Sequence, residues 1–294
     1  MKLAKLIEPY RIEKGRHFRL KQVDPADTLG LSLDRDTATD LLKEGVERLR
    51  ELQERLYAER RWALLVIFQA MDAAGKDSAI KHVMSGVNPQ GCRVYAFRRP
   101  SEEELAHDYM WRCMSRLPES GHIGIFNRSY YEETLVVRVH RELLACEHLP
   151  AKLVGPKIWQ QRFDDIRGAE RYLAHNGIVT CKFFLHVSKA EQRRRFIARL
   201  EEPDKQWKFE PADLTARENW DAYMHAYEEV IRHTATPEAP WYVVPADNKW
   251  FTRLVVSAAL IQRLKSLHLE YPQPSPALRR KLRAARAALE REKR

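Results

Sequence analysis

Gly75-Lys76 follows the apolar run 62–68, and a Gly-Lys pair in this place is typical of loops that bind phosphate groups. In the usual pattern, G-x-x-x-x-G-K-[ST], backbone N–H groups surround phosphates and the hydroxyl holds Mg²⁺. Here Ala70 replaces the first glycine and Asp77 replaces the hydroxyl. Asp72 lies inside the loop, where an anionic ligand would repel it unless a divalent cation lay between them. The pattern predicts a phosphate-binding loop, and an ordinary strand-to-helix turn is the alternative.

A second polar group, Asn127-Arg128, follows the predicted strand 123–126. Phosphate-loop enzymes normally carry an acid for Mg²⁺ at this place, and Asn127 can instead hold metal-bound water or a phosphate oxygen. Arg128 can stabilise charge on a transferring phosphoryl group through its planar set of donors. The alternative is a helix N-terminus in which Ser129 and Glu132 form a capping box. The two interpretations are compatible, because a capped helix start also binds anions.

A third group is the basic run Gln192–Leu200, followed by Lys205–Phe209. On a helix, Arg195 and Arg199 would share one face and repel each other unless an anion lay between them. Arginine-rich helices that lead into a mobile segment close lids over phosphates and exclude water. A solvated basic surface is the alternative. Trp250, after the last predicted strand, is equally consistent with stacking on a base and with core packing.

The predicted elements bring these groups to one edge of a sheet. Strands are predicted at 62–68, 93–97, 123–126, 178–187 and 241–245, and helices at 37–60, 78–85, 102–116, 157–176 and 189–200. Helices alternating with apolar strands favour an α/β fold with a parallel sheet of about five strands and helices on both sides. Ligands of such sheets bind at the carboxyl ends of the strands.

Three regions are predicted along the chain. Residues 1–35 show no clear period and are expected to form an irregular N-terminal arm. Residues 36–271 form the main domain, with a lid at about 190–215 and an insertion at 202–240 rich in proline, tryptophan and charge. Residues 272–294 form a basic tail, set apart by Pro-Gln-Pro-Ser-Pro.

The composition is that of an ordinary globular chain, with 44% hydrophobic and 31% charged residues. No run of about 18 apolar residues is present to span a bilayer. The N-terminus lacks the apolar core of a secretory signal, so a cytoplasmic location is expected. The four cysteines are widely spaced without a C-x-x-C pair, which indicates neither a zinc site nor a disulfide framework.

The net charge of +10 is concentrated at the C-terminus. Residues 272–294 carry eight Lys/Arg against two Glu, a net of +6, so the rest of the chain is only mildly basic. Anionic ligands must therefore be met by local clusters of cations. The tail is expected to form a helix that is solvated or docks on a partner subunit, with an anionic polymer as a further alternative.

Taken together, these residues closely resemble the polyphosphate kinase 2 family. The matching segments are Gln69–Asp77, Gly86–Gly91, Phe126–Glu133, Gln192–Arg195 with Arg199, Lys205–Phe209 and Ala239–Pro245. An acid inside the phosphate loop, paired with an Asn/Asp-Arg-Ser motif and a Trp-Lys lid, is not a general kinase pattern. The resemblance runs from about residue 15 to residue 272 and excludes the basic tail.

The resemblance implies a three-layer P-loop kinase fold of the thymidylate-kinase type. It implies transfer of the terminal phosphate of inorganic polyphosphate to AMP or ADP, with GMP and GDP as further acceptors, or the reverse reaction from ATP. Asn127 with Glu132 resembles the subgroup that accepts both AMP and ADP. The implied cofactor is Mg²⁺, with Mn²⁺ as an alternative. A homo-oligomer, dimer or tetramer, is expected, without a membrane or nucleic-acid partner.

The resemblance also assigns roles by position. Asp72 would bind the metal and orient the attacking phosphate, with Asn127 as a second metal contact, directly or through water. Lys76 and Arg128 would neutralise the transferring group, and the lid would clamp nucleotide and polymer. The implied lid cations are Arg193, Arg195, Arg199 and Lys208, and the implied phosphate or nucleotide contacts are Ala73, Ala74, Gly75, Asp77, Ser78 and Glu132.

Two other functions fit parts of the sequence. An ATP-dependent nucleoside monophosphate kinase would have the same fold with a different phosphate donor. A nucleic-acid-binding protein would use the basic tail, and deletion of residues 272–294 would then abolish its activity.

Overall fold

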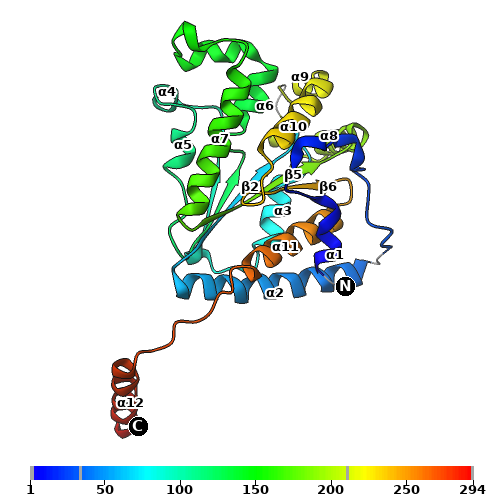
Figure 1. The fold of residues 1–294 in the computed structure, drawn as a ribbon. Coiled ribbons are helices and arrows are strands. Elements are labelled where there is room, and N and C mark those ends of the chain that lie inside the picture. Colours follow the sequence, from blue (N-terminus) through cyan, green and yellow to red (C-terminus); the bar gives the residue numbers. More distant parts are fainter. Residues whose placement is uncertain (1–2, 33–34, 210–211, 293–294) are drawn as a thin grey trace.

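The computed structural model describes residues 3–32, 35–209 and 212–292. Within these residues, six strands form one sheet in the order β1-β6-β5-β2-β4-β3, with helices on both faces (Figure 1). The strands are β1 (Arg11–Ile12), β2 (Ala63–Gln69), β3 (Cys92–Ala96), β4 (Ile123–Asn127), β5 (Ile178–His186) and β6 (Trp241–Pro245). Strands β2 to β6 are parallel, and β1 pairs antiparallel with β6. The predicted α/β fold with a parallel sheet is therefore confirmed.

Strand β2 lies at the centre of the core. All seven of its residues are buried, as expected for an apolar strand covered on both faces of a parallel sheet. Phe68 is in register with Asn127 of β4 on one side and with Phe183 of β5 on the other, where the two rings stack at 5.1 Å. The register brings the segments that follow β2 and β4 to the same edge of the sheet.

The helices form two layers (Figure 1). One face is covered by α2 (Arg35–Glu59), α3 (Lys76–Val83) and α11 (Lys249–Lys265), which contact one another, and by α1 (Leu3–Ile7). The other face is covered by α6 (Glu132–Val139), α7 (Ile158–His175) and α10 (Trp220–Thr234). The remaining helices are α4 (Glu102–Leu105), α5 (Trp111–Met114), α8 (Lys189–Glu201), α9 (Ala212–Glu218) and α12 (Pro276–Arg291).

The predicted helix 102–116 is wrong as a single element. Ser101 caps its start, but the helix ends at Leu105 and a second short helix begins at Trp111. Between them the carboxylate of Asp108 accepts a hydrogen bond from the backbone N–H of Met110 at 2.9 Å. Such a local side-chain bond offers the backbone an alternative to helix, and this accounts for the break.

The N-terminal arm is more regular than expected. It contains α1 and the edge strand β1, and it packs on α11. Leu6, Ile7 and Tyr10 are buried, and the hydroxyl of Tyr10 donates to Asp27 at 2.6 Å. A five-residue helix and a two-residue strand are too short to produce a readable period, because both depend on tertiary contacts.

The insertion at 202–240 contributes helix α10 to the layer over the sheet. Trp220, Tyr223, Tyr227 and Val230 are buried along one face at three- and four-residue spacing. Helix α11 also lies in a segment where no helix was predicted. Helix α7 is followed by Gly177, with φ +78°, and Ser188 caps α8 by accepting from the N–H of Glu191.

All four cysteines are unpaired, and Cys113 and Cys181 are buried. Among the helices described, none combines the length and apolar character that a bilayer crossing requires.

Candidate functional site

The loop between β2 and α3 has the shape expected of a phosphate-binding turn. Gly75 has φ +104°, and Ala73 has φ +59°, a left-handed conformation that is uncommon for a residue with a side chain. The backbone N–H of Ala79 donates to the carbonyl of Gly75, so helix α3 starts directly from the loop. A helix that begins in this way points its first N–H groups at the space beside the loop, where they attract anions.

Lys76 is the first residue of α3 and is almost fully buried. Its ammonium donates to the carbonyl oxygen of Ala70 at 3.0 Å. Burial lowers the pKa of Lys76, and the neighbouring Arg128 lowers it further, while Asp72 raises it. The lysine is therefore a poorly hydrated cation, held in the loop beside a second cation.

Arg128 joins the phosphate loop to the motif after β4. Its guanidinium donates to Asp72 at 2.8 Å and to Glu132 at 3.3 Å. Glu132 raises the pKa of Arg128 most, and Asp72 adds to this effect. The backbone of Arg128 has φ +66°, and its N–H donates to the carbonyl of Phe68. A strained backbone held by its surroundings is characteristic of functional sites, so the conformation of Arg128 is itself a sign of function.

Asn127 and Asp77, two positions where the sequence departs from the usual phosphate-loop pattern, contact each other. The amide nitrogen of Asn127 donates to Asp77 at 2.7 Å. In the usual arrangement a hydroxyl on the loop faces an acid at the end of the neighbouring strand. Here the acid is on the loop and the neutral donor is on the strand, so the two chemical types have exchanged places.

The predicted capping box at Ser129 and Glu132 is wrong. Helix α6 begins at Glu132 without a side-chain cap, because the hydroxyl of Ser129 accepts from the N–H of Tyr131. The carboxylate of Glu132 faces Arg128, and the amide nitrogen of Gln69 donates to it at 2.8 Å when the amide is oriented to satisfy both neighbours. Gln69 was not among the predicted site residues. Its signal was present as a polar residue at the end of a buried apolar strand.

In this structure Arg195 makes protein contacts that the sequence did not predict. Its five N–H donors meet five protein acceptors: Glu191, and the backbone carbonyls of Ala73, Ala74, Ala246 and Asp247. The distances are 2.6 to 3.1 Å. Because a guanidinium has five donors, Arg195 has none left for a phosphate in this structure. It instead ties the phosphate loop to α8 and to the segment after β6.

Two of the other predicted lid residues, Arg193 and Arg199, lie on α8. Arg193 is exposed, and the guanidinium of Arg199 lies over the ring of Phe196 at 5.5 Å. The side chain of Lys208 lies outside the described residues. The predicted phosphate contacts of these three residues stay predictions. The start of α8 contacts the phosphate loop, because the side-chain amide of Gln192 donates to the carbonyl of Asp72 at 3.0 Å.

A buried polar network supports the Arg128 segment from behind. Glu170 accepts hydrogen bonds from the hydroxyls of Tyr130 and Tyr131, at 3.0 and 2.7 Å, and forms an ion pair with Lys182 at 2.6 Å. Lys182 also donates to the carbonyl of Thr234. Burial lowers the pKa of Lys182, and Glu170 opposes that change. The network connects four elements, so it holds the two tyrosines after Arg128 rigidly.

Arg253 of α11 contacts the loop helix α3 and was not among the predicted site residues. Arg253 donates to the hydroxyl of Ser78 at 2.9 Å. Burial lowers the pKa of Lys249, and Arg195 and Arg253 lower it further. Trp250 packs partly buried against Phe251, at 5.5 Å between ring centroids, which supports the core interpretation of this tryptophan.

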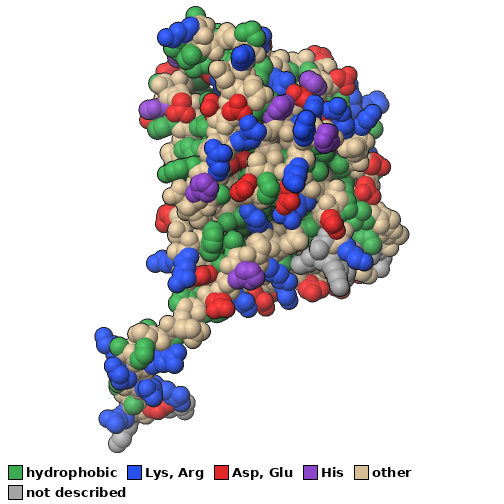
Figure 2. All heavy atoms as spheres, viewed as in Figure 1, with side chains coloured by type: hydrophobic (Ala, Val, Ile, Leu, Met, Phe, Trp, Pro, Cys, Tyr) green, Lys and Arg blue, Asp and Glu red, His purple; other side chains and the backbone are tan. Residues whose placement is uncertain are grey.

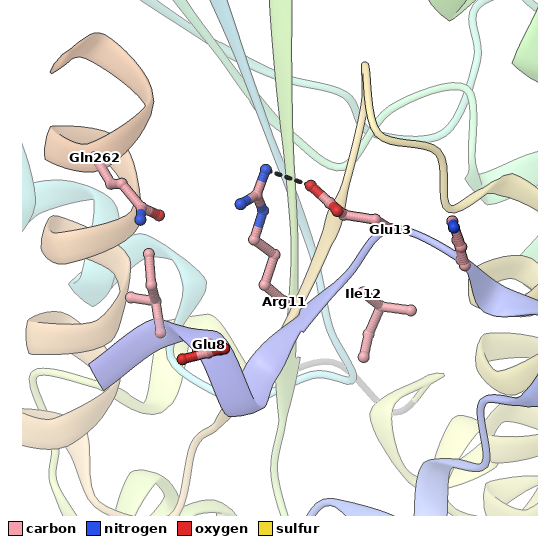
Figure 3. Close-up of a pocket in the computed structure, with 7 residues that line it drawn as sticks. Glu8, Arg11, Ile12, Glu13 and Gln262 are labelled. Atoms are coloured by element: carbon pink, nitrogen blue, oxygen red, sulfur yellow. Dashed lines mark ion pairs between the residues drawn. The ribbon is translucent and has the colours of Figure 1, made fainter. Parts of the chain in front are cut away.

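A hollow of about 650 Å³ lies elsewhere, beside the edge strand β1 (Figure 3). Glu8, Arg11, Glu13 and Gln262 are among its lining residues, and Arg11 forms an ion pair with Glu13. Strand β1 pairs with the beginning of β6, whereas the phosphate loop lies at the carboxyl ends of the strands. The hollow is therefore separate from the candidate site.

Within the described ranges no group of three or more His, Cys, Asp or Glu side chains is arranged to hold a metal ion. This is compatible with Mg²⁺, which proteins often hold through one or two carboxylates while substrate phosphates and water complete the shell. Asp72, Asp77 and Asn127 supply oxygen atoms of this kind around the loop.

Comparisons with known proteins agree with this geometry. A family model described as polyphosphate kinase 2 (PPK2) matches residues 32–272. An ADP-polyphosphate phosphotransferase of Rhodopseudomonas palustris is 52% identical, over 85% of this chain and 87% of the relative. An AMP/ADP-polyphosphate phosphotransferase of Meiothermus ruber is 46% identical, over 92% and 97% respectively. The crystal structure of polyphosphate kinase 2 from Arthrobacter aurescens TC1 is similar with a TM-score of 0.84 and 38% identity, over 93% of this chain and 95% of that chain.

Proposed function

The chain belongs to the polyphosphate kinase 2 family, and we propose that it transfers the terminal phosphate of inorganic polyphosphate to both AMP and ADP. It is a polyphosphate-dependent nucleotide phosphotransferase. The observation that carries the site assignment is the Arg128 guanidinium, held between Asp72 of the phosphate loop and Glu132 of α6, beside the buried Lys76. Two cations and two carboxylates thus meet where two parallel strands end.

The chemistry explains why cations dominate this place. Phosphoryl transfer depends mainly on positioning and on neutralising charge, and here both reactants are phosphates. Lys76 would bind the transferring group, and its partly desolvated ammonium would interact strongly with a phosphate oxygen. Arg128 would bind the same group through its planar donors after exchanging one carboxylate contact.

We propose that Mg²⁺ is bound by Asp72 and Asn127, the latter directly or through water, with Asp77 close by through its hydrogen bond to Asn127. The ion would neutralise phosphate oxygens and orient donor and acceptor. The loop supports this assignment because the carboxylates of Asp72 and Asp77 would repel a bound phosphate unless a cation lay between them. Mn²⁺ would occupy the same oxygen ligands.

The proposal also covers acceptor specificity, namely that the enzyme accepts both AMP and ADP. It is supported by Asn127 with Glu132, and by the printed names of the relatives, one an ADP enzyme and the other an AMP/ADP enzyme. GMP and GDP are proposed as weaker acceptors. The cytoplasmic location and the homo-oligomeric state expected from the sequence stay predictions.

The test is to supply polyphosphate, Mg²⁺ and either AMP or ADP without ATP, and to follow the nucleotides by chromatography. Product from both acceptors supports the proposal, and product from ADP alone refutes the AMP part. No product from either would favour the ATP-dependent monophosphate kinase, which a parallel reaction with ATP and AMP would detect. Chelation of the metal with EDTA should stop transfer, and added Mg²⁺ should restore it.

A further inference from the structure

Helix α12 stands apart from the rest of the molecule. Every residue from 276 to 292 is exposed, and the body of the protein ends at the buried Leu269. Figure 1 shows the helix at the end of an extended segment, away from both helical layers. The segment contains Pro272 and Pro274, and proline-rich segments act as semi-rigid spacers. The helix also lies beyond residues 32–272, which match the family.

Helix α12 carries a strong excess of positive charge. Its six cations are Arg279, Arg280, Lys281, Arg283, Arg286 and Arg291, against the single acid Glu290. This net of +5 is half of the +10 carried by the whole chain. Figure 2 shows the basic side chains gathered on this helix. Successive residues of a helix are about 100° apart, so the run 279–281 alone places cations on three sides of α12.

A second copy of the chain is a poor partner for this helix. Leu278, Leu282, Ala285 and Leu289 have the four-three-four spacing of a coiled-coil seam, and the three leucines are 46 to 65% exposed. The flanking positions of that seam carry Arg279, Lys281 and Arg286. Two such helices would bring like charges together in either orientation, and the seam is only about two heptads long.

A membrane surface also fits poorly. Helices that lie on membranes separate a polar face from a broad apolar face, often with Trp or Phe. In α12 the cations cover three sides of the helix, the apolar stripe on the fourth is narrow, and residues 276–294 contain no aromatic residue. A flexible linear polyanion is the partner that cations on several sides can contact at once.

We propose that α12 binds inorganic polyphosphate at a second place, outside the transfer site, and tethers long chains to the enzyme. The proposal rests on polyphosphate being the phosphate donor. A chain bound at both places gains affinity, because the second contact forms at a high effective concentration. A chain too short to reach both places gains nothing, so the contribution of α12 depends on chain length.

The test variant combines Arg279→Gln, Arg280→Gln, Lys281→Gln, Arg283→Gln and Arg286→Gln, which removes charge while keeping good helix formers. Calorimetric titration of the full chain should show about tenfold weaker binding of long polyphosphate. Binding of tripolyphosphate should not change. In kinetics the KM for long chains should rise in proportion, with kcat and the KM for tripolyphosphate unaffected. Added salt should diminish the difference between wild type and variant.

The matched control combines Leu278→Gln, Leu282→Gln and Leu289→Gln, which should leave polyphosphate affinity and oligomeric state unchanged. Equal affinity of wild type and the charge variant for long chains would overturn the proposal. The proposal would also be overturned if the charge variant lost binding to phosphatidylglycerol vesicles but kept its affinity for polyphosphate. A change in oligomeric state caused by the leucine variant would overturn it as well. Because calorimetry needs no turnover, failure of the tether is distinguishable from failure of the transfer reaction.

Discussion

Replacing Arg195 with methionine is expected to destabilise the protein and slow phosphate transfer, although Arg195 has no donor left for substrate. The substitution removes four bonds to backbone carbonyls and one to Glu191. A bond to a charged group contributes about 1.5–3 kcal/mol. Water can reach part of this site after the change, so the sum overestimates the loss. We expect the free energy of unfolding to fall by about 3–5 kcal/mol, as for one broken buried ion pair.

The effect on rate follows from the loop that Arg195 holds. Ala73 and Ala74 carry two of the four carbonyls, and Ala73 has a left-handed backbone that needs such support. A displacement of about 1 Å in a phosphate-positioning loop lowers the rate about 100-fold. The assay is kcat with saturating ADP and polyphosphate, alongside urea unfolding of the protein without substrates.

Arg194→Met is the matched control. Arg194 is the preceding residue, donates to the same Glu191 and is exposed. Its loss should change the free energy of unfolding by no more than about 0.5 kcal/mol and leave kcat near wild type. If Arg195→Met slowed transfer without lowering stability, Arg195 would act on the substrate directly and the positioning argument would be wrong.

Three further variants test other parts of the structure. Lys76→Met should lower kcat by about 100- to 1000-fold, the usual cost of one lost transition-state donor, without lowering the melting temperature. Burial and the nearby Glu147 raise the pKa of Glu133 to about 8, so the folded state keeps a proton that the unfolded state loses. Stability should therefore fall as pH rises from the ordinary carboxyl pKa towards 8, and Glu133→Gln should flatten that decline in urea unfolding. Lys182→Met should cost about 3–5 kcal/mol in the same assay, because Glu170 is left buried without its cation.

Each of these expectations has a contrary result. Full activity of Lys76→Met would remove the phosphate-loop assignment. A pH profile of stability that is the same with and without Glu133 would mean that this carboxyl titrates normally in the folded protein. Adding Glu170→Gln to Lys182→Met should recover part of the stability, and an unchanged double variant would mean that lost packing, rather than the unpaired charge, causes the defect.

Regular elements were predictable where the local pattern was long. Strand β2 and helix α2 were predicted to within about two residues. A continuous apolar run indicates a strand buried on both faces, and a repeated three-four spacing indicates a helix buried on one face. Helix α10 was missed although its buried face has that same spacing, because the proline and charge on either side of it dominated the segment. Strand β1 has two residues and forms only through its partner β6, so no local signal exists for it.

The chemical types at the site were visible in the sequence, whereas their pairing was not. Asp72, Lys76 and Arg128 were selected from their places after strands, and the parallel register of β2 and β4 brings them together. The contact of Asn127 with Asp77 joins residues 50 positions apart. Gln69 belongs to the site because its amide donates to Glu132, which is also distant in the sequence. Hydrogen bonds between distant segments depend on backbone geometry that local spacing does not contain.

By itself the sequence determined the fold class, the phosphate loop and the family resemblance, because these depend on residue types at short, fixed spacing. Only the tertiary structure decided what the charges do. Arg195 was predicted to bind phosphate, and in this structure its guanidinium donates to backbone carbonyls, while the cations of α12 are exposed to solvent. The physical reason is that an arginine has the same charge wherever it lies, and its function depends on which acceptors the fold brings within hydrogen-bonding distance.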